Sequence, residues 1–250
     1  MFDSFVRTEL LIGPDGLATL AAAKVAVIGI GGVGSYAAEA LARTGIGHLL
    51  LVDDDAVCLT NVNRQIIALR STVGRPKVEV MAERIRDINP DAEVEAVQEY
   101  FGPDSAERIV GPGLSYVVDA IDTVSAKLEL VMRCKALGIP IVSAMGTGNK
   151  FDPTRLELAD ISETSVCPLA RVMRKELRKR GVDSLRVIYS REEPIKIDES
   201  ANPCRQHCIC PKKDRTCVGR RSVPGSTSFV PPAAGLIAAS VVVRGLLGKD

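Results

Sequence analysis

Short apolar runs alternate along the first 150 residues with longer segments in which apolar residues recur every three or four positions. The short runs predict strands, which we expect at 24–30, 48–53, 93–97, 115–121 and 140–144. The longer segments predict helices at 35–44, 75–89, 104–110 and 123–137. This alternation is typical of a doubly wound α/β fold, a Rossmann-like, mostly parallel sheet with helices on both faces.

The pattern changes on both sides of this unit. Residues 1–23 predict an N-terminal helical appendage that is broken at Pro14–Gly16. Residues 24–149 are the expected Rossmann-like domain, and 150–250 are a small α+β extension. In the extension we expect strands at 155–161, 185–190 and 194–197, a basic helix at 169–180, a polar loop at 198–224 and an apolar helix at 233–247.

The composition is that of a soluble globular protein, with 46% hydrophobic and 25% charged residues. The longest apolar stretch, 229–243, contains two prolines and ends at Arg244, so it is too short and too interrupted to span a bilayer. The first ten residues mix charged with apolar side chains, unlike a secretory signal. We therefore expect a cytoplasmic protein.

The net charge of +1 conceals an uneven distribution. Between residues 168 and 221 the chain carries fifteen Lys and Arg against seven Asp and Glu. This basic insert predicts a polyanionic partner, although a solvated surface helix and loop would have the same composition.

A glycine-rich motif follows the first predicted strand. Residues 29–34 read GIGGVG, in which Gly29, Gly31 and Gly34 have the spacing G-x-G-x-x-G and Gly32 is an additional glycine. Such a turn brings backbone N–H groups close to phosphates, and the helix that follows directs its positive N-terminus at them. The motif predicts a nucleotide site without choosing between mononucleotides and dinucleotides.

Charged residues after the later strands indicate which kind of nucleotide binds. Asp53 and Asp55 follow the second predicted strand, where a carboxylate meets the ribose hydroxyls. Arg64 and Lys77 come next, and Asp122 follows the fourth predicted strand. Because the carboxyl ends of parallel strands meet at one edge of a sheet, we expect these side chains to share one crevice. Two cations suit a triphosphate and a carboxylate suits Mg²⁺, which favours ATP over a nicotinamide cofactor.

A cluster of cysteines lies in the long polar loop. Cys204, Cys208, Cys210 and Cys217 have the spacing C-x3-C-x-C-x6-C. Four thiolates this close together suit Zn²⁺ or an iron–sulfur cluster. Free thiols, a redox pair or a docking loop for a sulfur-transfer or redox partner remain open alternatives.

Several segments resemble a known superfamily. GIGGVG, LVDDDAVCLTNVNRQ, VGRPKVE and VVDAIDT are similar to the ATP-dependent adenylating module of the ThiF/MoeB/HesA and ubiquitin-activating-enzyme superfamily. Within it, RTELLIG, TNVNRQI, GRPKVEVMAERIRDINP and DAIDTVSAK are most similar to the tRNA threonylcarbamoyladenosine dehydratases. The resemblance is dense over residues 5–164 and resumes at 222–237.

The resemblance implies a role for each matching residue. It places Gly32 and Gly34 in the phosphate loop and Asp53 on the ribose. The phosphate contacts that it implies are Asn61, Arg64 and Lys77, and Lys127 is placed near the nucleotide. Asp122 would position Mg²⁺, with Asp119 as a weaker candidate. Arg7 matches an arginine that family homodimers insert into the partner's ATP site.

The chemistry that the resemblance implies is ATP-dependent dehydration of threonylcarbamoyladenosine in tRNA through an acyl-adenylate. The basic insert would then bind tRNA. The main alternative is an adenylyltransferase that activates the C-terminal glycine of a ubiquitin-like sulfur-carrier protein, although the paired C-x-x-C zinc motif of such enzymes is absent. A nucleotide-holding adaptor and an NAD-dependent oxidoreductase are further alternatives.

Overall fold

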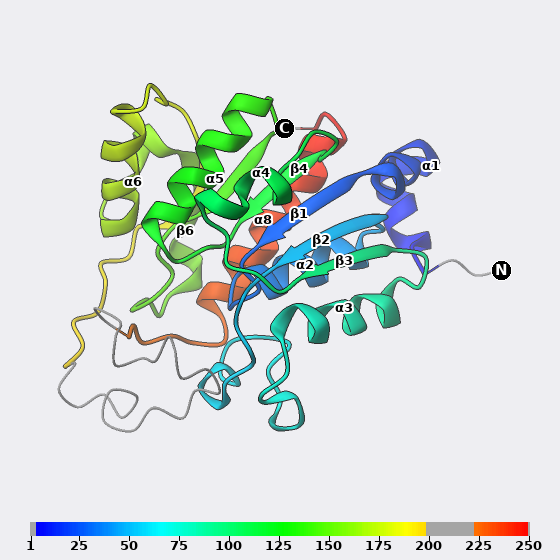
Figure 1. Cartoon of the computed structure of the whole chain (residues 1–250), viewed down its shortest axis with the longest axis horizontal. Coiled ribbons are helices and arrows are strands. Elements are labelled where there is room, and N and C mark those ends of the chain that lie inside the picture. The colour runs from blue at the N-terminus through cyan, green and yellow to red at the C-terminus, as the bar shows by residue number, and fades with distance from the viewer. Residues whose placement is uncertain (1–3, 199–222, 250) are drawn as a thin grey trace.

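One seven-stranded sheet organises the molecule, with the strand order β3-β2-β1-β4-β5-β7-β6 (Figure 1). We describe residues 4–198 and 223–249 of the chain in a computed structural model. The strands are β1 (Lys24–Ile28), β2 (His48–Val52), β3 (Glu93–Val97), β4 (Tyr116–Asp119), β5 (Ile141–Ala144), β6 (Leu156–Asp160) and β7 (Arg186–Ser190). All neighbours pair in parallel except β6 and β7, which are antiparallel. The predicted doubly wound, mostly parallel α/β fold is confirmed.

Helices cover both faces of this sheet (Figure 1). They are α1 (Val6–Ala22), α2 (Gly34–Arg43), α3 (Lys77–Ile88), α4 (Pro103–Ile109), α5 (Val124–Leu137), α6 (Pro168–Arg178) and α8 (Val230–Leu246). Side chains of β1 alternate between two cores. Val25 and Val27 pack in the core that contains α2, α3 and α8, whereas Ala26 and Ile28 pack in the core that contains α4, α5 and α6. Apolar residues follow one another without alternation in these strands because both faces of each strand are buried.

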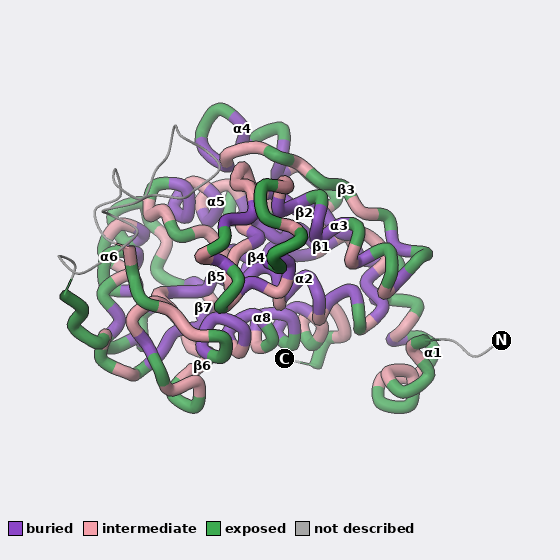
Figure 2. Tube along the Cα trace, turned by 90° about the horizontal axis from the view of Figure 1, so that it is seen from below, coloured by how far each residue is buried: buried purple, intermediate pink, exposed green. Residues whose placement is uncertain are grey.

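The outer strands differ from the inner ones in burial. Strands β1, β2, β4 and β5 are almost fully buried, whereas every residue of β3 is exposed or half-buried (Figure 2). The alternating polarity of 93–97 therefore did indicate an edge strand, because one side of β3 has no neighbouring strand.

The C-terminal extension completes the same sheet. Strand β7 pairs with β5, and β6 forms the other edge of the sheet. The strand expected at 194–197 is absent, which corrects the prediction. The backbone hydrogen bond described there runs from Ile195 N–H to the carbonyl oxygen of Asn149, a loop residue, over 2.8 Å. An apolar alternation is insufficient for a strand where no neighbouring strand offers hydrogen bonds.

Helix α8 closes the sheet on the face that α2 also covers. It begins at Val230, earlier than expected, because Pro231 and Pro232 occupy its first turn, where no N–H donor is needed. The two helices meet at Gly235, where an added Cβ would lie 2.3 Å from the Val33 carbonyl oxygen. Close helix packing thus depends on that glycine.

Helix α1 lies at the outside of the core (Figure 2). It bends at Gly13, whose φ of 75° interrupts the helix just before Pro14, whereas the expected break at Pro14–Gly16 is itself helical. Leu10 and Leu11 are each 82% exposed. Among the described helices, none is long and apolar enough to cross a membrane.

Candidate active site

The glycine loop joins β1 to α2 at the carboxyl edge of the sheet. Gly29 has a φ of 93° and donates its N–H to the Val52 carbonyl oxygen over 2.7 Å. A Cβ on Gly29 would lie 2.7 Å from the Ala120 carbonyl oxygen, and a Cβ on Gly34 would lie 1.7 Å from that of Gly29. The turn is therefore possible only with glycine at both positions.

Asp53 connects this loop to the end of β2. One carboxylate oxygen accepts the Ile30 N–H over 2.7 Å, and the other accepts the Asp55 N–H over 2.8 Å. Lys77, the first residue of α3, donates to Asp55 over 2.9 Å and to Asp53 over 3.4 Å. The structure thus brings the glycine loop, both predicted carboxylates and the predicted lysine into one hydrogen-bonded cluster.

Burial controls the electrostatics of this cluster. It raises the pKa of Asp53, and the neighbouring Lys77 ammonium offsets only part of the rise. Burial alone would lower the pKa of Lys77, but the charges of Asp53 and Asp55 outweigh it and raise that pKa. Lys77 therefore stays protonated and supplies positive charge beside the phosphate-binding loop.

The segment after β2 places three polar side chains near the glycines. The Asn61 side-chain oxygen accepts the Cys58 N–H over 3.0 Å, and Arg64 donates to the Thr60 carbonyl oxygen over 2.9 Å. The Arg64 Cγ lies 3.5 Å from the position of a Cβ on Gly32. Gln65 is buried, and its Oε1 atom has no hydrogen-bond partner in the described structure. The arrangement leaves a polar cradle beside the loop.

The residues after β4 divide into an exposed and a buried group. Asp122 is exposed and follows Ala120, whose carbonyl oxygen adjoins Gly29. Asp119 and Lys127 are completely buried and form an ion pair of 2.8 Å, and Ser143 donates to the same Asp119 oxygen over 2.5 Å. In this structure the charges of Lys127 and Asp119 are already paired with each other. Their observed contacts tie α5, β4 and β5 together below the site.

Arg7 is the site residue that the described fold does not bring to the cluster. It is exposed on α1. Helix α1 packs near Gly45 and Gly47, just before β2, and hence at the amino edge of the sheet. The glycine loop lies at the opposite edge, so Arg7 does not reach the cluster of its own chain. The cysteine cluster at Cys204, Cys208, Cys210 and Cys217 lies outside the described residues.

Helix α6 carries several of the described basic residues of the insert, and Lys179 and Arg180 directly follow it. Arg174 donates to the Thr164 carbonyl oxygen over 2.8 Å, and Lys179 and Arg180 both pair with Glu176. Three exposed cations make no hydrogen bond or ion pair with the described residues, namely Arg171, Lys175 and Arg178. Their spacing of four and three residues places them on one helix face.

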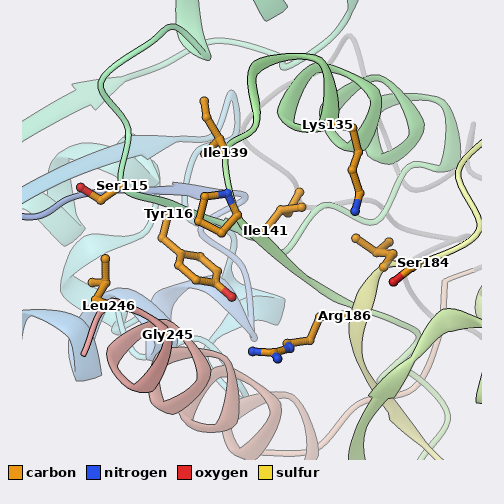
Figure 3. Close-up of a pocket in the computed structure, with 11 residues that line it drawn as sticks. Ser115, Tyr116, Lys135, Ile139, Ile141, Ser184, Arg186, Gly245 and Leu246 are labelled. Atoms are coloured by element: carbon orange, nitrogen blue, oxygen red, sulfur yellow. The ribbon is translucent and has the colours of Figure 1, made fainter. Parts of the chain in front are cut away.

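A cavity of about 370 Å³ lies away from this site, at the amino ends of β4, β5 and β7 (Figure 3). Tyr116, Lys135 and Arg186 line it together with apolar side chains. The candidate residues at the carboxyl edge are not among its lining. Its volume is therefore no guide to the site of the chemistry.

The family model for the ThiF family matches residues 5–250. The chain belongs to the ThiF family. This ThiF-family chain is 48% identical to the tRNA threonylcarbamoyladenosine dehydratase of Bacillus subtilis, over 100% of its length and 96% of the relative's. The Escherichia coli enzyme of the same name is 39% identical, with 98% and 94% covered.

The fold is shared with a solved member of the ThiF family. The crystal structure of the Escherichia coli dehydratase TcdA in complex with ATP matches with a TM-score of 0.84 at 37% identity. The match covers 98% of this chain and 94% of that chain. The family that the glycine loop and the residues after it indicated is thus confirmed.

Lys150 is the polar residue of this edge that sequence reasoning missed. It is buried, and its Nζ atom has no hydrogen-bond partner in the described structure. No motif marks it, because only the tertiary structure shows that its amine is both buried and unpaired.

Proposed function

We propose that this protein dehydrates threonylcarbamoyladenosine in tRNA, using ATP to activate the carboxylate of the threonyl group. The observation that carries the proposal is the match to dehydratases of that name over essentially the whole chain. The cluster at the carboxyl edge of the sheet supports it, since hydrogen bonds join the glycine loop, Asp53 and Lys77 there.

The site suits the activation step. A carboxylate is a poor electrophile, so its oxygen first attacks the α-phosphorus of ATP, and pyrophosphate leaves. The glycine loop and the N-terminus of α2 receive phosphate oxygens, while Lys77 and Arg64 neutralise charge that builds up in the transition state. Asp53, held by the Ile30 and Asp55 N–H groups, is placed for the ribose hydroxyls.

The second step needs no nucleophile from the protein. An atom of the adjacent urea attacks the acyl carbon, the carbon–oxygen bond to AMP breaks, and a ring forms. The products are a nucleoside that has lost one water, AMP and pyrophosphate. The protein's part is to hold the two reacting groups of one substrate in line.

Oxygen ligands for Mg²⁺ are present at this edge. The carboxylates of Asp53, Asp54 and Asp55 offer oxygens within 4.8 Å of one another, and Asp122 is exposed beside the loop. We assign Asp122 to the metal because its carboxylate is exposed just after β4, beside the glycine loop. The metal would neutralise the phosphates and orient them.

Mass spectrometry of the nucleosides tests the proposal. The protein is incubated with ATP, Mg²⁺ and tRNA that carries threonylcarbamoyladenosine, and the tRNA is then digested under mild conditions. We expect a loss of one water that requires ATP, disappears in Asp122→Ala and persists in Asp87→Ala, which changes an exposed aspartate of α3. An unchanged nucleoside despite ATP binding contradicts the proposal and favours adenylation of a sulfur-carrier protein.

A further inference from the structure

The amine of Lys150 is unusual among the charged groups of the described structure. The residue is only 3% exposed, and its Nζ atom has no hydrogen-bond partner. Buried ammonium groups normally have a paired anion, because removing an unpaired charge from water is costly. An orphaned group of this kind therefore calls for an explanation.

Neighbouring acidic groups do not supply the missing partner. Glu192 uses its carboxylate to accept the Phe151 N–H over 3.0 Å and the Asp152 N–H over 2.9 Å. Burial lowers the pKa of Lys150, and the charges of Cys167, Glu192 and Glu193 act in the opposite direction without reversing the result. These neighbouring charges therefore do not fully compensate the burial of the amine.

Positive backbone φ angles occur just before Lys150 and just before Cys167. Asn149 and Val166 are the two non-glycine residues with positive φ in the described chain, at 57° and 60°. Asn149 directly precedes Lys150, and Val166 directly precedes Cys167. A β-branched residue at positive φ is a rare outlier, and such strain is concentrated at functional sites.

Lys150 follows the strand next to β4, at the same edge as the glycine loop. Asp119 of β4 pairs with Ser143 of β5, so the loop after β5 begins beside the segment that carries Asp122. Asn149 donates its N–H to the Gly225 carbonyl oxygen over 2.8 Å and accepts the Gly225 N–H over 2.7 Å.

The segment 223–231 then connects the Lys150 loop to the nucleotide site. The Ser226 carbonyl oxygen accepts a hydrogen bond of 3.0 Å from Asn63, which in turn accepts one of 2.9 Å from Arg64. At its far end, Pro231 lies 3.0 Å from the position of a Cβ on Gly32. One short segment therefore contacts both the Lys150 loop and the glycine loop of the nucleotide site.

We propose that Lys150 binds the substrate carboxylate that ATP activates; this rests on the dehydratase function proposed above. One carboxylate oxygen would accept a charge-assisted hydrogen bond from Nζ. The other oxygen would attack the α-phosphorus, with the new oxygen–phosphorus bond replacing the bond to pyrophosphate. No proton moves at Lys150 in this step. The substrate thus brings the anion that the described residues do not supply.

A pair of RNA ligands isolates this contact. One is an anticodon stem-loop that carries threonylcarbamoyladenosine, and the other is the same RNA with the carboxylate converted to a carboxamide. Fluorescence anisotropy without ATP measures both affinities. We expect the wild-type protein to prefer the carboxylate by about tenfold or more, and Lys150→Met to bind both RNAs equally. Lys150→Arg should keep the preference, as should Lys135→Met, which removes an exposed lysine at the opposite edge.

Each other outcome overturns the proposal. Lys150→Met that still prefers the carboxylate shows that another group recognises it. Weakened ATP binding in Lys150→Met assigns the amine to a phosphate. A melting temperature of Lys150→Met well below that of the wild type shows that the amine is already paired in the free protein. If instead the wild-type protein removes no water from the nucleoside, the proposed function itself fails.

Discussion

Gly34 has no space for a side chain, although it lies in the first turn of a helix that would accept alanine elsewhere. An added Cβ would lie 1.7 Å from the Gly29 carbonyl oxygen, inside the loop that receives phosphates. Relief of this contact requires α2 to move away from β1. The same glycine therefore serves the packing of α2 and the shape of the nucleotide site.

Gly34→Ala tests this double role. We expect a loss of about 3 kcal/mol of the free energy of unfolding, because overpacked backbone has no flexible neighbour that can yield. Urea denaturation measures the loss, and isothermal titration with ATP should show that binding is lost. Gly111→Ala is the matched control, since a Cβ there has no neighbour within 4 Å. Equal stability of the two variants would contradict the argument.

At the scale of elements, an ion-pair clamp connects α2 to α3. Glu39 of α2 is buried, and Arg84 of α3 donates to its two oxygens over 2.6 and 2.9 Å. Arg43 adds a third bond of 2.7 Å. Burial alone would raise the pKa of Glu39, but the bonds from Arg84 and Arg43 outweigh it and lower that pKa.

The clamp predicts a definite dependence of stability on pH. Because the pKa is lower in the folded state, the clamp stabilises fully above the ordinary value of 4.5 and is lost as the pH falls through the folded value. Glu39→Gln should cost about 1–3 kcal/mol at pH 7 and flatten the acid side of the stability curve. Glu83→Gln, which removes an exposed partner of Arg75, should leave the curve almost unchanged. Parallel curves for Glu39→Gln and the wild type would contradict the assignment.

Helix α6 offers a second prediction at this scale. If Arg171, Lys175 and Arg178 contact tRNA phosphates, replacing all three by Glu should weaken tRNA binding. The negative slope of log affinity against log salt concentration should also become shallower, by about 0.7–0.9 for each phosphate that is no longer neutralised. Filter binding at several salt concentrations measures both. Glu176→Gln is a suitable control, because that carboxylate pairs with Lys179 and Arg180 just after the helix and repels phosphates. An unchanged slope would remove α6 from the RNA interface.

At the scale of the whole molecule, Arg7 and the glycine loop lie at opposite edges of the sheet. We propose a homodimer in which Arg7 enters the partner's ATP site, and the exposed Leu10 and Leu11 of the same helix fit an interface. Such sites are shared, so a defect in one part can be complemented by the other subunit.

Mixed dimers test this arrangement. Arg7→Ala and Asp122→Ala subunits should each be inactive alone. After equal mixing with subunit exchange, about a quarter of the wild-type activity should return, because half of the dimers are mixed and each has one intact site. Light scattering verifies the dimer. Failure to complement, with exchange demonstrated, would show that each site is built from one chain.

Local sequence patterns were sufficient to predict much of the fold and of the nucleotide site. Apolar runs predicted the inner strands because their residues are buried on both faces, and the glycine spacing predicted a turn that only glycine can form. Asp53 and Lys77 could be expected in one crevice because the carboxyl ends of parallel strands meet at one edge, whereas their ion pair was seen only in the structure. The sequence shows which residues follow a strand, and the parallel topology then brings those residues to the same edge of the sheet.

Features that depend on burial by residues distant in the chain could be seen only in the tertiary structure. Nothing in the sequence around Lys127 distinguishes it from a surface lysine. In the structure it is completely buried and forms an ion pair with Asp119. Arg174 belongs to a basic helix but is held by Thr164, and 194–197 forms no strand because no partner strand is available. Lys150 lacks any motif and is notable only for the absence of a partner in the described structure. Each outcome depends on neighbours that are distant in the chain, which periodicity and spacing do not encode.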